Sequence, residues 1–306
     1  MAKKTRLKRR DLKEKERSLG VDHPDTLTAV NNLGLLLFHD NKLGEAERQN
    51  QRALEGRERI LGVDHRDTLT SINNLGALLF KQNKFKEAEL LYRRSFKGQE
   101  RVLGVDHLDT RISVNNLGLV LYKQSKFEEA ELMFRRVLAS TEQIFGVNHS
   151  ETLDSMSSLA SVLQEKKDFS SAETFARRSL EGYVRVIKEH AKNNILTKND
   201  EKKFWSVARG VTLLTNILQA QNKMKEARAI KEKYSRRELY KQALDVTGCL
   251  HYYASSKCFW LTIVMLIVIV LVLLYRQRLH VVTCSTDDGG SDNILDDMPW
   301  SSDNEL

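Results

Sequence analysis

Apolar side chains recur every three or four residues over most of the chain, with polar residues between them. One such series is Leu69, Ile72, Leu75 and Leu79, and the next is Ala88, Leu91, Tyr92 and Phe96. This spacing gathers the apolar side chains on one face of an α-helix. The polar residues 81–84 separate the two series. The pattern therefore predicts two amphipathic helices joined by a short turn.

The same helix-pair pattern returns at a spacing of 42 residues. Each copy opens with a related nonapeptide: LGVDHPDTL at 19, LGVDHRDTL at 61, LGVDHLDTR at 103 and FGVNHSETL at 145. The motif NNLG follows at 31, 73 and 115, and SSLA stands in its place at 157. Helix pairs repeated at this period predict an all-α solenoid, in which each pair buries its apolar face against its neighbours.

Small residues occupy matched places in the two helices of each repeat. Gly34, Gly76, Gly118 and Ala160 each precede an alanine by 12 residues, namely Ala46, Ala88, Ala130 and Ala172. With the aromatic Tyr92 and Phe134 that follow, this order matches the tetratricopeptide repeat (TPR) pattern. Residues Leu19 to Val186 resemble the 42-residue TPR units of kinesin light chains, which carry the same NNLG and EAE text. The resemblance implies a superhelical solenoid with a concave, peptide-binding groove.

The boundaries of the predicted units follow from the repeat. They are a basic capping helix over 1–18, TPR units over 19–60, 61–102, 103–144 and 145–186, and an insertion with a degenerate fifth unit over 187–245. In the first of these segments Leu12 takes the place that Leu54 has in the second helix of the first TPR unit. That correspondence favours a cap that packs like the second helix of a preceding repeat.

The resemblance also implies which residues line the groove. By the family's numbering of helix faces, the first helices turn carboxamides, aromatic rings and ammonium groups inward: Asn31, Asn73, Asn115, Phe38, Phe80, Tyr122, Lys81 and Lys123. Each carboxamide can donate to and accept from the backbone of an extended peptide. The alternative is that these asparagines are merely tolerated on a solvated face. We expect the adjacent Asn32, Asn74 and Asn116 to tie helix to helix.

One segment departs from the amphipathic pattern. Residues 259–275 contain no charged side chain, and Trp260 and Tyr275 stand at the two ends. An uninterrupted apolar run with aromatic ends is typical of a transmembrane helix, here placed at 258–275, although a buried core helix is the alternative. Because no targeting segment is evident before it, we expect an N-terminal domain in the cytosol and a single span in the endoplasmic reticulum or another endomembrane rather than the plasma membrane.

An acidic tail over 276–306 completes the predicted organisation. It holds two Lys/Arg and seven Asp/Glu, so the formal net charge of +8 divides into +13 before the tail and −5 within it. Its last four residues, DNEL, are similar to a retrieval signal for the endoplasmic reticulum, and Trp300 among its aspartates suggests a ligand for the chain's own groove. Both interpretations remain open.

Recurring polar pairs invite stronger claims about chemistry. The Asp-His pairs, such as Asp22 and His23, stand in separate repeats, which favours helix capping over a shared metal ion. The Arg pairs, such as Arg93 and Arg94, follow glutamates by a helical turn and are typical of an ion-paired face. Phosphate-binding loops, nucleophile elbows and Cys/His clusters are missing from the sequence, so we expect no enzyme, metal or cofactor.

The remaining question is the partner. The sequence favours an adaptor or scaffold that binds extended peptide motifs of cytosolic proteins, and the alternative is a tail-anchored co-chaperone or protein-import receptor. Motor proteins stay open as partners, although the sequence lacks the long heptad segment through which kinesin light chains pair with the motor heavy chain. Basic residues are interleaved with glutamate, which argues against nucleic acid. The basic cluster from Lys3 to Arg10 fits a nuclear signal, a solvated tail or, given the predicted span, contact with an anionic membrane.

Overall fold

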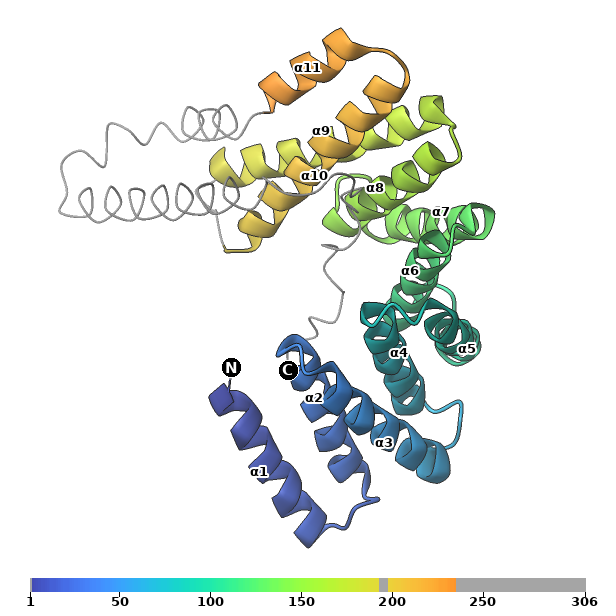
Figure 1. Cartoon of the computed structure of the whole chain (residues 1–306), viewed down its shortest axis with the longest axis vertical. Helices are drawn as coiled ribbons and strands as arrows, with labels where there is room; N and C mark the ends of the chain where they lie inside the picture. The colour runs from blue at the N-terminus through green and yellow to red at the C-terminus, as the bar shows by residue number, and fades with distance from the viewer. Residues whose placement is uncertain (1, 193–197, 235–306) are drawn as a thin grey trace, which may run out of the picture. The chain divides into compact units, whose positions relative to one another are not determined.

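The computed structural model describes residues 2–192 and 198–234, and in these residues all regular structure is helical. Eleven helices follow one another along this part of the chain: α1 (Ala2–Ser18), α2 (Pro24–His39), α3 (Leu43–Leu61), α4 (Arg66–Lys81), α5 (Phe85–Leu103), α6 (Leu108–Lys123), α7 (Phe127–Phe145), α8 (Ser150–Glu165), α9 (Phe169–Lys192), α10 (Lys198–Ala220) and α11 (Met224–Lys233) (Figure 1). The predicted all-α array of paired helices is confirmed for these residues. Described residues up to Phe175 form one compact unit, and those from Ala176 form a second.

A histidine begins each first helix of the four repeats. The Nδ1 atom of His65 accepts a hydrogen bond from the backbone N–H of Asp67 at 3.2 Å, and His23, His107 and His149 do the same at 3.1–3.3 Å. This bond satisfies one of the backbone donors that every helix start leaves unpaired. The preceding aspartate has another role, since Asp22 pairs with Arg59. Capping, which the sequence favoured over metal binding, is confirmed for the histidines.

The second helices α3, α5 and α7 each end at a glycine. The N–H of Gly62 donates to the carbonyl of Glu58 at 3.2 Å, and its φ of 87° lies in the left-handed region that favours glycine. The turn within each repeat uses the same backbone region without glycine, as at Asn41 and Asn83 with φ of 57° and 61°. Asparagine is the side chain that tolerates this conformation best. These stops fix the helix lengths that the repeat requires.

Close approach of the paired helices depends on glycine in the first of them. A Cβ added to Gly76 would lie 2.9 Å from a ring carbon of Tyr92, and one added to Gly118 would lie 2.9 Å from Phe134. The alanines on the second helices, such as Ala88, are fully buried. Glycine therefore packs against the aromatic side chain one turn beyond the alanine, rather than against the alanine itself.

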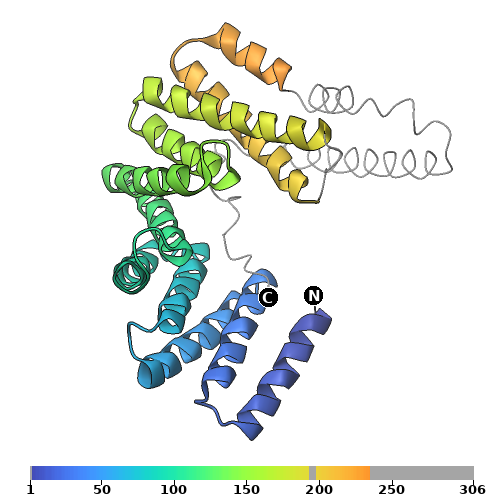
Figure 2. The same ribbon diagram turned by 180° about the vertical axis from the view of Figure 1, so that it is seen from behind.

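Helices of the first unit contact one another in a regular order. Every helix from α1 to α7 packs against the next one along the chain, α7 packs against α8, and α2 also contacts α4 while α4 contacts α6 (Figures 1 and 2). The first helices of successive repeats are thus direct neighbours. Their shared surface is where a groove lined by first helices has to lie.

Helix α1 packs on α2, the first helix of the first repeat. Leu12 is 6% exposed, and its counterpart Leu54 in α3 is 5% exposed. In the second unit, α10 packs against α11, Arg177 pairs with Glu226 at 2.9 Å, and Gly210 lies against Leu180. Helices α10 and α11 fall in the segment assigned to a degenerate fifth repeat.

The predicted span at 258–275 and the acidic tail at 276–306 lie outside the described residues. Within the described part of the chain, all helices are too short or too polar to cross a bilayer.

Candidate peptide-binding face

The residues predicted to bind peptide lie on α2, α4 and α6, at equivalent places one repeat apart. We call this surface, with Asn31, Phe38, Asn73, Phe80, Lys81, Asn115, Tyr122 and Lys123, the first-helix face. Because α2 contacts α4 and α4 contacts α6, the face is continuous over three repeats. Its residues differ in how much of each side chain is available to a ligand.

The carboxamides of the face form a ladder between repeats. Asn74 donates through Nδ2 to Oδ1 of Asn31 at 3.1 Å, and Asn116 donates to Oδ1 of Asn73 at 3.4 Å. The hydroxyl of Ser113 also donates to Oδ1 of Asn73, at 3.4 Å. Asn74 and Asn116 therefore tie helix to helix as expected, and each donates to the first asparagine of the preceding repeat. The same expectation is wrong for Asn32, which is exposed and has no hydrogen-bond partner among the described residues.

This ladder leaves donor groups rather than acceptors for a ligand. The Nδ2 groups of Asn31 and Asn73 make no hydrogen bond within the described residues, although Asn31 is only 5% exposed. Asn115 is half-buried, and its carboxamide has no hydrogen-bond partner among the residues that the structure describes. Asn115 is thus the carboxamide on the face with both its donor and its acceptor available.

The aromatic residues of the face are more enclosed than a groove lining requires. Phe38 and Phe80 are 7% and 8% exposed, and the ring of Phe80 packs edge-on against Phe85 at a centroid distance of 5.4 Å. Tyr122 is half-buried, and its hydroxyl donates to Oε1 of Glu165 at 3.3 Å. Burial, and then the nearby negative charge of Glu165, raises the pKa of Tyr122 well above its ordinary value. Tyr122 therefore stays a hydrogen-bond donor at any physiological pH.

The two lysines close the face at the ends of α4 and α6. Lys81 is exposed, and its Nζ lies 4.6 Å from the centre of the Phe38 ring in the preceding repeat. A cation over an aromatic face is attracted by the ring's negative electrostatic potential. Lys123 is half-buried at the equivalent place in α6. The aliphatic stem of Lys81 helps to cover Phe38, while its charge faces solvent.

A buried polar cluster behind the face was not predicted. Arg57 of α3 is 4% exposed, and its guanidinium donates to the carbonyl of Asp67 at 2.9 Å, to the Ser71 hydroxyl at 2.9 Å and to the Thr28 hydroxyl at 3.1 Å. Burial lowers the pKa of Arg57. In the next repeat Gln99 takes this position and accepts from Ser113 at 2.5 Å. The sequence signal that could have predicted this cluster is a polar residue at the same core position of three successive repeats: Arg57, Gln99 and Thr141.

The opposite side of the repeats carries the ion pairs expected from the Arg pairs. Arg93 pairs with Glu89 on the same helix at 2.8 Å, and Arg94 pairs with Glu58 of the preceding repeat at 2.5 Å. Burial raises the pKa of Glu89, but hydrogen bonds from Lys126, Arg93 and Gln124 outweigh it and hold the pKa below the ordinary 4.5. The ion-paired face is confirmed, and it joins neighbouring repeats as well as turns of one helix.

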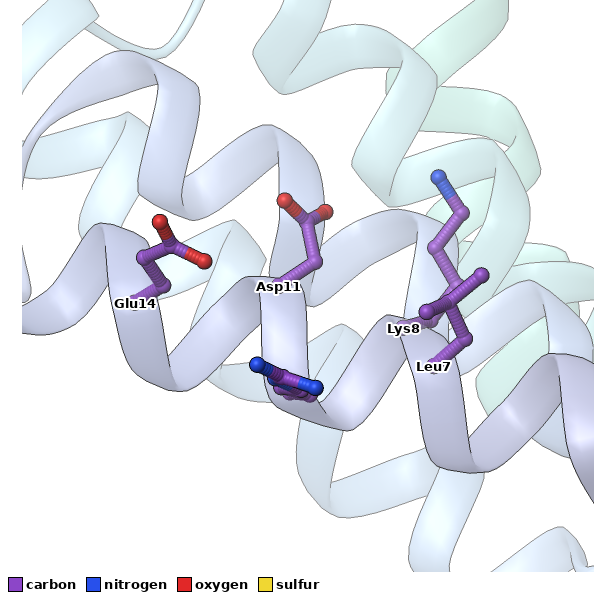
Figure 3. A pocket seen from close by; sticks show the side chains of 5 residues that line it. Leu7, Lys8, Asp11 and Glu14 are labelled. Carbon is purple, nitrogen blue, oxygen red and sulfur yellow. The ribbon is translucent and has the colours of Figure 1, made fainter.

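In the described ranges, no group of three His, Cys, Asp or Glu side chains is close enough to hold a metal ion. A hollow of about 430 Å³ adjoins α1, and the described residues that line it all belong to that helix: Leu7, Lys8, Arg10, Asp11 and Glu14 (Figure 3). Its lining mixes both signs of charge and includes none of the residues of the first-helix face.

Comparison with known families gives one match. The model of the tetratricopeptide repeat matches residues 25–101, 91–143 and 110–183, which together span 25–183 and just over half of the 306 residues. None of the curated proteins compared with the chain matches it.

Solved structures share the fold. BtubC (BKLC) from P. vanneervenii superposes with a TM-score of 0.64 at 16% identity, covering 77% of this chain and 89% of that one. The nearly identical TPR-like repeats assigned to a kinesin light chain of Podosopora anserina give 0.56 at 19% identity, with 72% and 98% covered. The apo form of RapI gives 0.52 at 11% identity, with 75% and 88% covered. At these identities the likeness establishes the fold alone.

Proposed function

Because this chain belongs to the tetratricopeptide repeat family, we propose that it is a non-catalytic adaptor that binds extended peptide segments of partner proteins on the first-helix face. The observation that carries the proposal is the carboxamide ladder. The Oδ1 atoms of Asn31 and Asn73 accept hydrogen bonds from the next repeat. Their Nδ2 groups, and the whole carboxamide of Asn115, make no hydrogen bond within the described residues and lie on three adjoining helices. An extended peptide presents backbone carbonyls at regular intervals, which such donors can bind.

The decisive variant is Asn115→Ala. Its carboxamide has no hydrogen bond to the described residues, so the substitution removes a ligand contact without breaking an internal one. Asn73→Ala is less suitable alone, because Asn73 accepts from Asn116 and Ser113. Peptide-array binding with the fragment 1–248 should lose about five- to thirtyfold in affinity for Asn115→Ala, as expected for one hydrogen bond whose partner stays buried.

Asn32→Ala is the matched control. Asn32 is exposed on α2, lacks a hydrogen-bond partner among the described residues, and lies one residue outside the ladder. Equal binding by the wild type and by both variants, with unchanged melting temperatures, would remove the first-helix face as the binding site.

A chaperone or import-receptor role remains the second candidate because of Lys81. Its exposed ammonium, beside Phe38, could hold a carboxylate at the end of a partner chain. Arrays of peptides with free and amidated C-termini separate the two functions. If only the free acids bind, and Lys81→Ala abolishes their binding, the receptor role replaces the general adaptor.

We also propose that the apolar run at 258–275 anchors the adaptor in an endomembrane, with the TPR units in the cytosol and the tail at 276–306 in the lumen. The absence of charge over residues 259–275 supports this proposal. A glycosylation acceptor placed after Asp287 tests it. Modification in microsomes is expected, and an unmodified, alkali-extractable chain would contradict the span. Association with a kinesin motor is a further possibility that co-precipitation with heavy chain would decide.

A further inference from the structure

Helix α1 is strongly basic for its length. It contains nine Lys/Arg and three Asp/Glu, a net charge of +6 in 17 residues. The four TPR units over 19–186 are nearly balanced by comparison, with 23 Lys/Arg and 24 Asp/Glu. A charge so concentrated on one terminal helix creates a local potential that the averaged composition conceals.

Four of these bases share one face of α1. Arg6, Arg10, Lys13 and Arg17 follow at intervals of four, three and four residues, which aligns them along a helix. All four are exposed, and within the described residues none has an ion-pair partner. We call them the basic stripe. It extends over about 16 Å at a rise of 1.5 Å per residue.

The other charged residues of α1 behave differently where they meet the repeats. Arg9 pairs with Glu45, and Glu16 pairs with Arg52 at 2.7 Å. Leu12 is buried against α2 on the same side. One side of α1 is therefore committed to capping the first repeat, and in both views the helix is the first in the stack of the first unit, with α2 beside it (Figures 1 and 2). The residues of the basic stripe take no part in that packing and stay exposed.

An apolar side chain stands beside the stripe. Leu7 is 64% exposed, directly after Arg6 and one turn before Arg10, and Lys8, Asp11 and Glu14 lie along the same side of the helix (Figure 3). A helix that presents lysine and arginine with an exposed leucine next to them has the composition of a surface that lies on anionic lipid. We infer that the basic stripe of α1 binds the headgroups of anionic phospholipids, with Leu7 entering the boundary of the acyl chains.

Anionic lipid fits these observations better than nucleic acid. Helix α1 carries no aromatic residue on which bases could stack. The stripe also belongs to a single straight helix without a groove of basic residues around it. The predicted span over residues 258–275 would hold the TPR units near a bilayer, but the charge and exposure of α1 stand without it.

Vesicle co-flotation tests the inference on the full chain, synthesised in a cell-free system with vesicles present. Phosphatidylcholine vesicles measure any insertion of the predicted span. Vesicles with 30% phosphatidylserine measure the added effect of anionic lipid, and this excess is the readout. We expect the excess to be at least about tenfold in partition at low salt and to fall steeply as salt rises.

Charge reversal identifies the surface. Arg6→Glu, Arg10→Glu and Arg17→Glu combined should remove the excess. The matched control is the triple variant Arg48→Glu, Lys86→Glu and Lys97→Glu, at exposed positions on α3 and α5 that also lack ion pairs in the described chain, and it should keep the excess. Both triples change the net charge equally, so a general charge effect would reduce both alike. Leu7→Ser should weaken binding severalfold at unchanged charge.

Three results would overturn the inference: equal flotation of the wild type on both vesicle types, equal loss in both triples, or a stripe triple that keeps the excess. Circular dichroism confirms that each variant is folded. A gel shift with a short single-stranded RNA runs in parallel. If RNA binding depends on the stripe and the lipid excess is absent, nucleic acid is the ligand instead. Loss of binding to phosphatidylcholine alone concerns the predicted span and leaves this inference untouched.

Discussion

The glycine near the middle of α2, α4 and α6 has a measurable structural role. The Cβ of an alanine at position 76 would lie 2.9 Å from Cε1 of Tyr92, closer than such atoms approach in proteins. Tyr92 is fully buried and cannot move aside without disturbing its own neighbours. Gly76→Ala should therefore lower the free energy of unfolding by about 1–3 kcal/mol, despite the higher helix propensity of alanine. Urea unfolding followed by circular dichroism measures the difference.

Gly44 provides the control for that substitution. It lies in the first turn of α3, and a Cβ added there would have no atom within 4 Å. Gly44→Ala should leave stability unchanged or raise it by up to about 1 kcal/mol. Equal destabilisation by both substitutions would show that backbone effects, and not contact with Tyr92, explain the glycine at 76.

The NN pair shows which parts of the candidate site could be read from the sequence. The period of 42 and the helical pattern were enough to place Asn31, Asn73 and Asn115 on equivalent faces. They could not decide the direction of each carboxamide, because adjacent residues differ by about 100° around a helix and the twist between repeats determines which one reaches its neighbour. The bond from Asn74 to Asn31 depends on that twist. For the same reason Phe38 and Phe80 are more buried than a lining role suggests.

At the scale of elements, repeats are joined by polar bonds as well as apolar packing. Glu89 of α5 accepts hydrogen bonds from Lys126 at 2.7 Å and from Gln124 at 2.8 Å, both in the turn before α7. Its pKa is lower in the folded chain than the ordinary 4.5, so the ionised form stabilises the fold. That contribution is fully present above pH 4.5 and is lost as pH falls through the lowered folded value.

The pH dependence leads to a test with Glu89→Gln. At pH 7 the variant should be less stable than the wild type by about 1–3 kcal/mol, because Glu89 is only 8% exposed and the charged acceptor of three hydrogen bonds is replaced by a neutral amide. Below pH 4.5 the difference should shrink as the carboxylate of the wild type gains a proton. Thermal unfolding at pH 7, 5 and 3 measures it. Glu87→Gln, at an exposed position on the same helix, should show little effect, and a pH-independent cost at Glu89 would argue against the proposed ion pairs.

The ends of the helices are the feature that the sequence predicts best, because they depend on hydrogen bonds between residues close together in the chain. Histidine at the start and glycine at the end act through bonds within a few residues. The cluster around Arg57 depends instead on residues from 10 to 29 positions away. A charged residue at a core position would normally be assigned to the surface, and only its return as Gln99 and Thr141 at the same place in later repeats could have suggested otherwise.

At the scale of the whole molecule, the constant period predicts that a complete repeat can be removed. Deleting residues 103–144 brings α8 to the place of α6, so that Gln99 would meet Ser155 instead of Ser113. Because each repeat contacts only its neighbours, the shortened chain should fold with the same helix content per residue and a smaller denaturant m-value. Circular dichroism and urea unfolding measure both.

A deletion of different length controls for the register. Removal of residues 107–144 takes out four residues fewer and leaves four surplus residues in the linker between α5 and α8. That variant should unfold at lower urea or aggregate, since Gly104, which ends α5, and His149, which caps α8, are then four residues farther apart than the repeat requires. Equal stability of the two deletions would mean that the interfaces between repeats do not require the 42-residue register.

The exposed Asn32 carries information of another kind. In α4 and α6 the equivalent asparagines donate to the preceding repeat, whereas among the described helices none stands where Asn32 could donate. Within the described residues Asn32 therefore presents at the surface the same donor group that Asn74 and Asn116 use to join one repeat to the next.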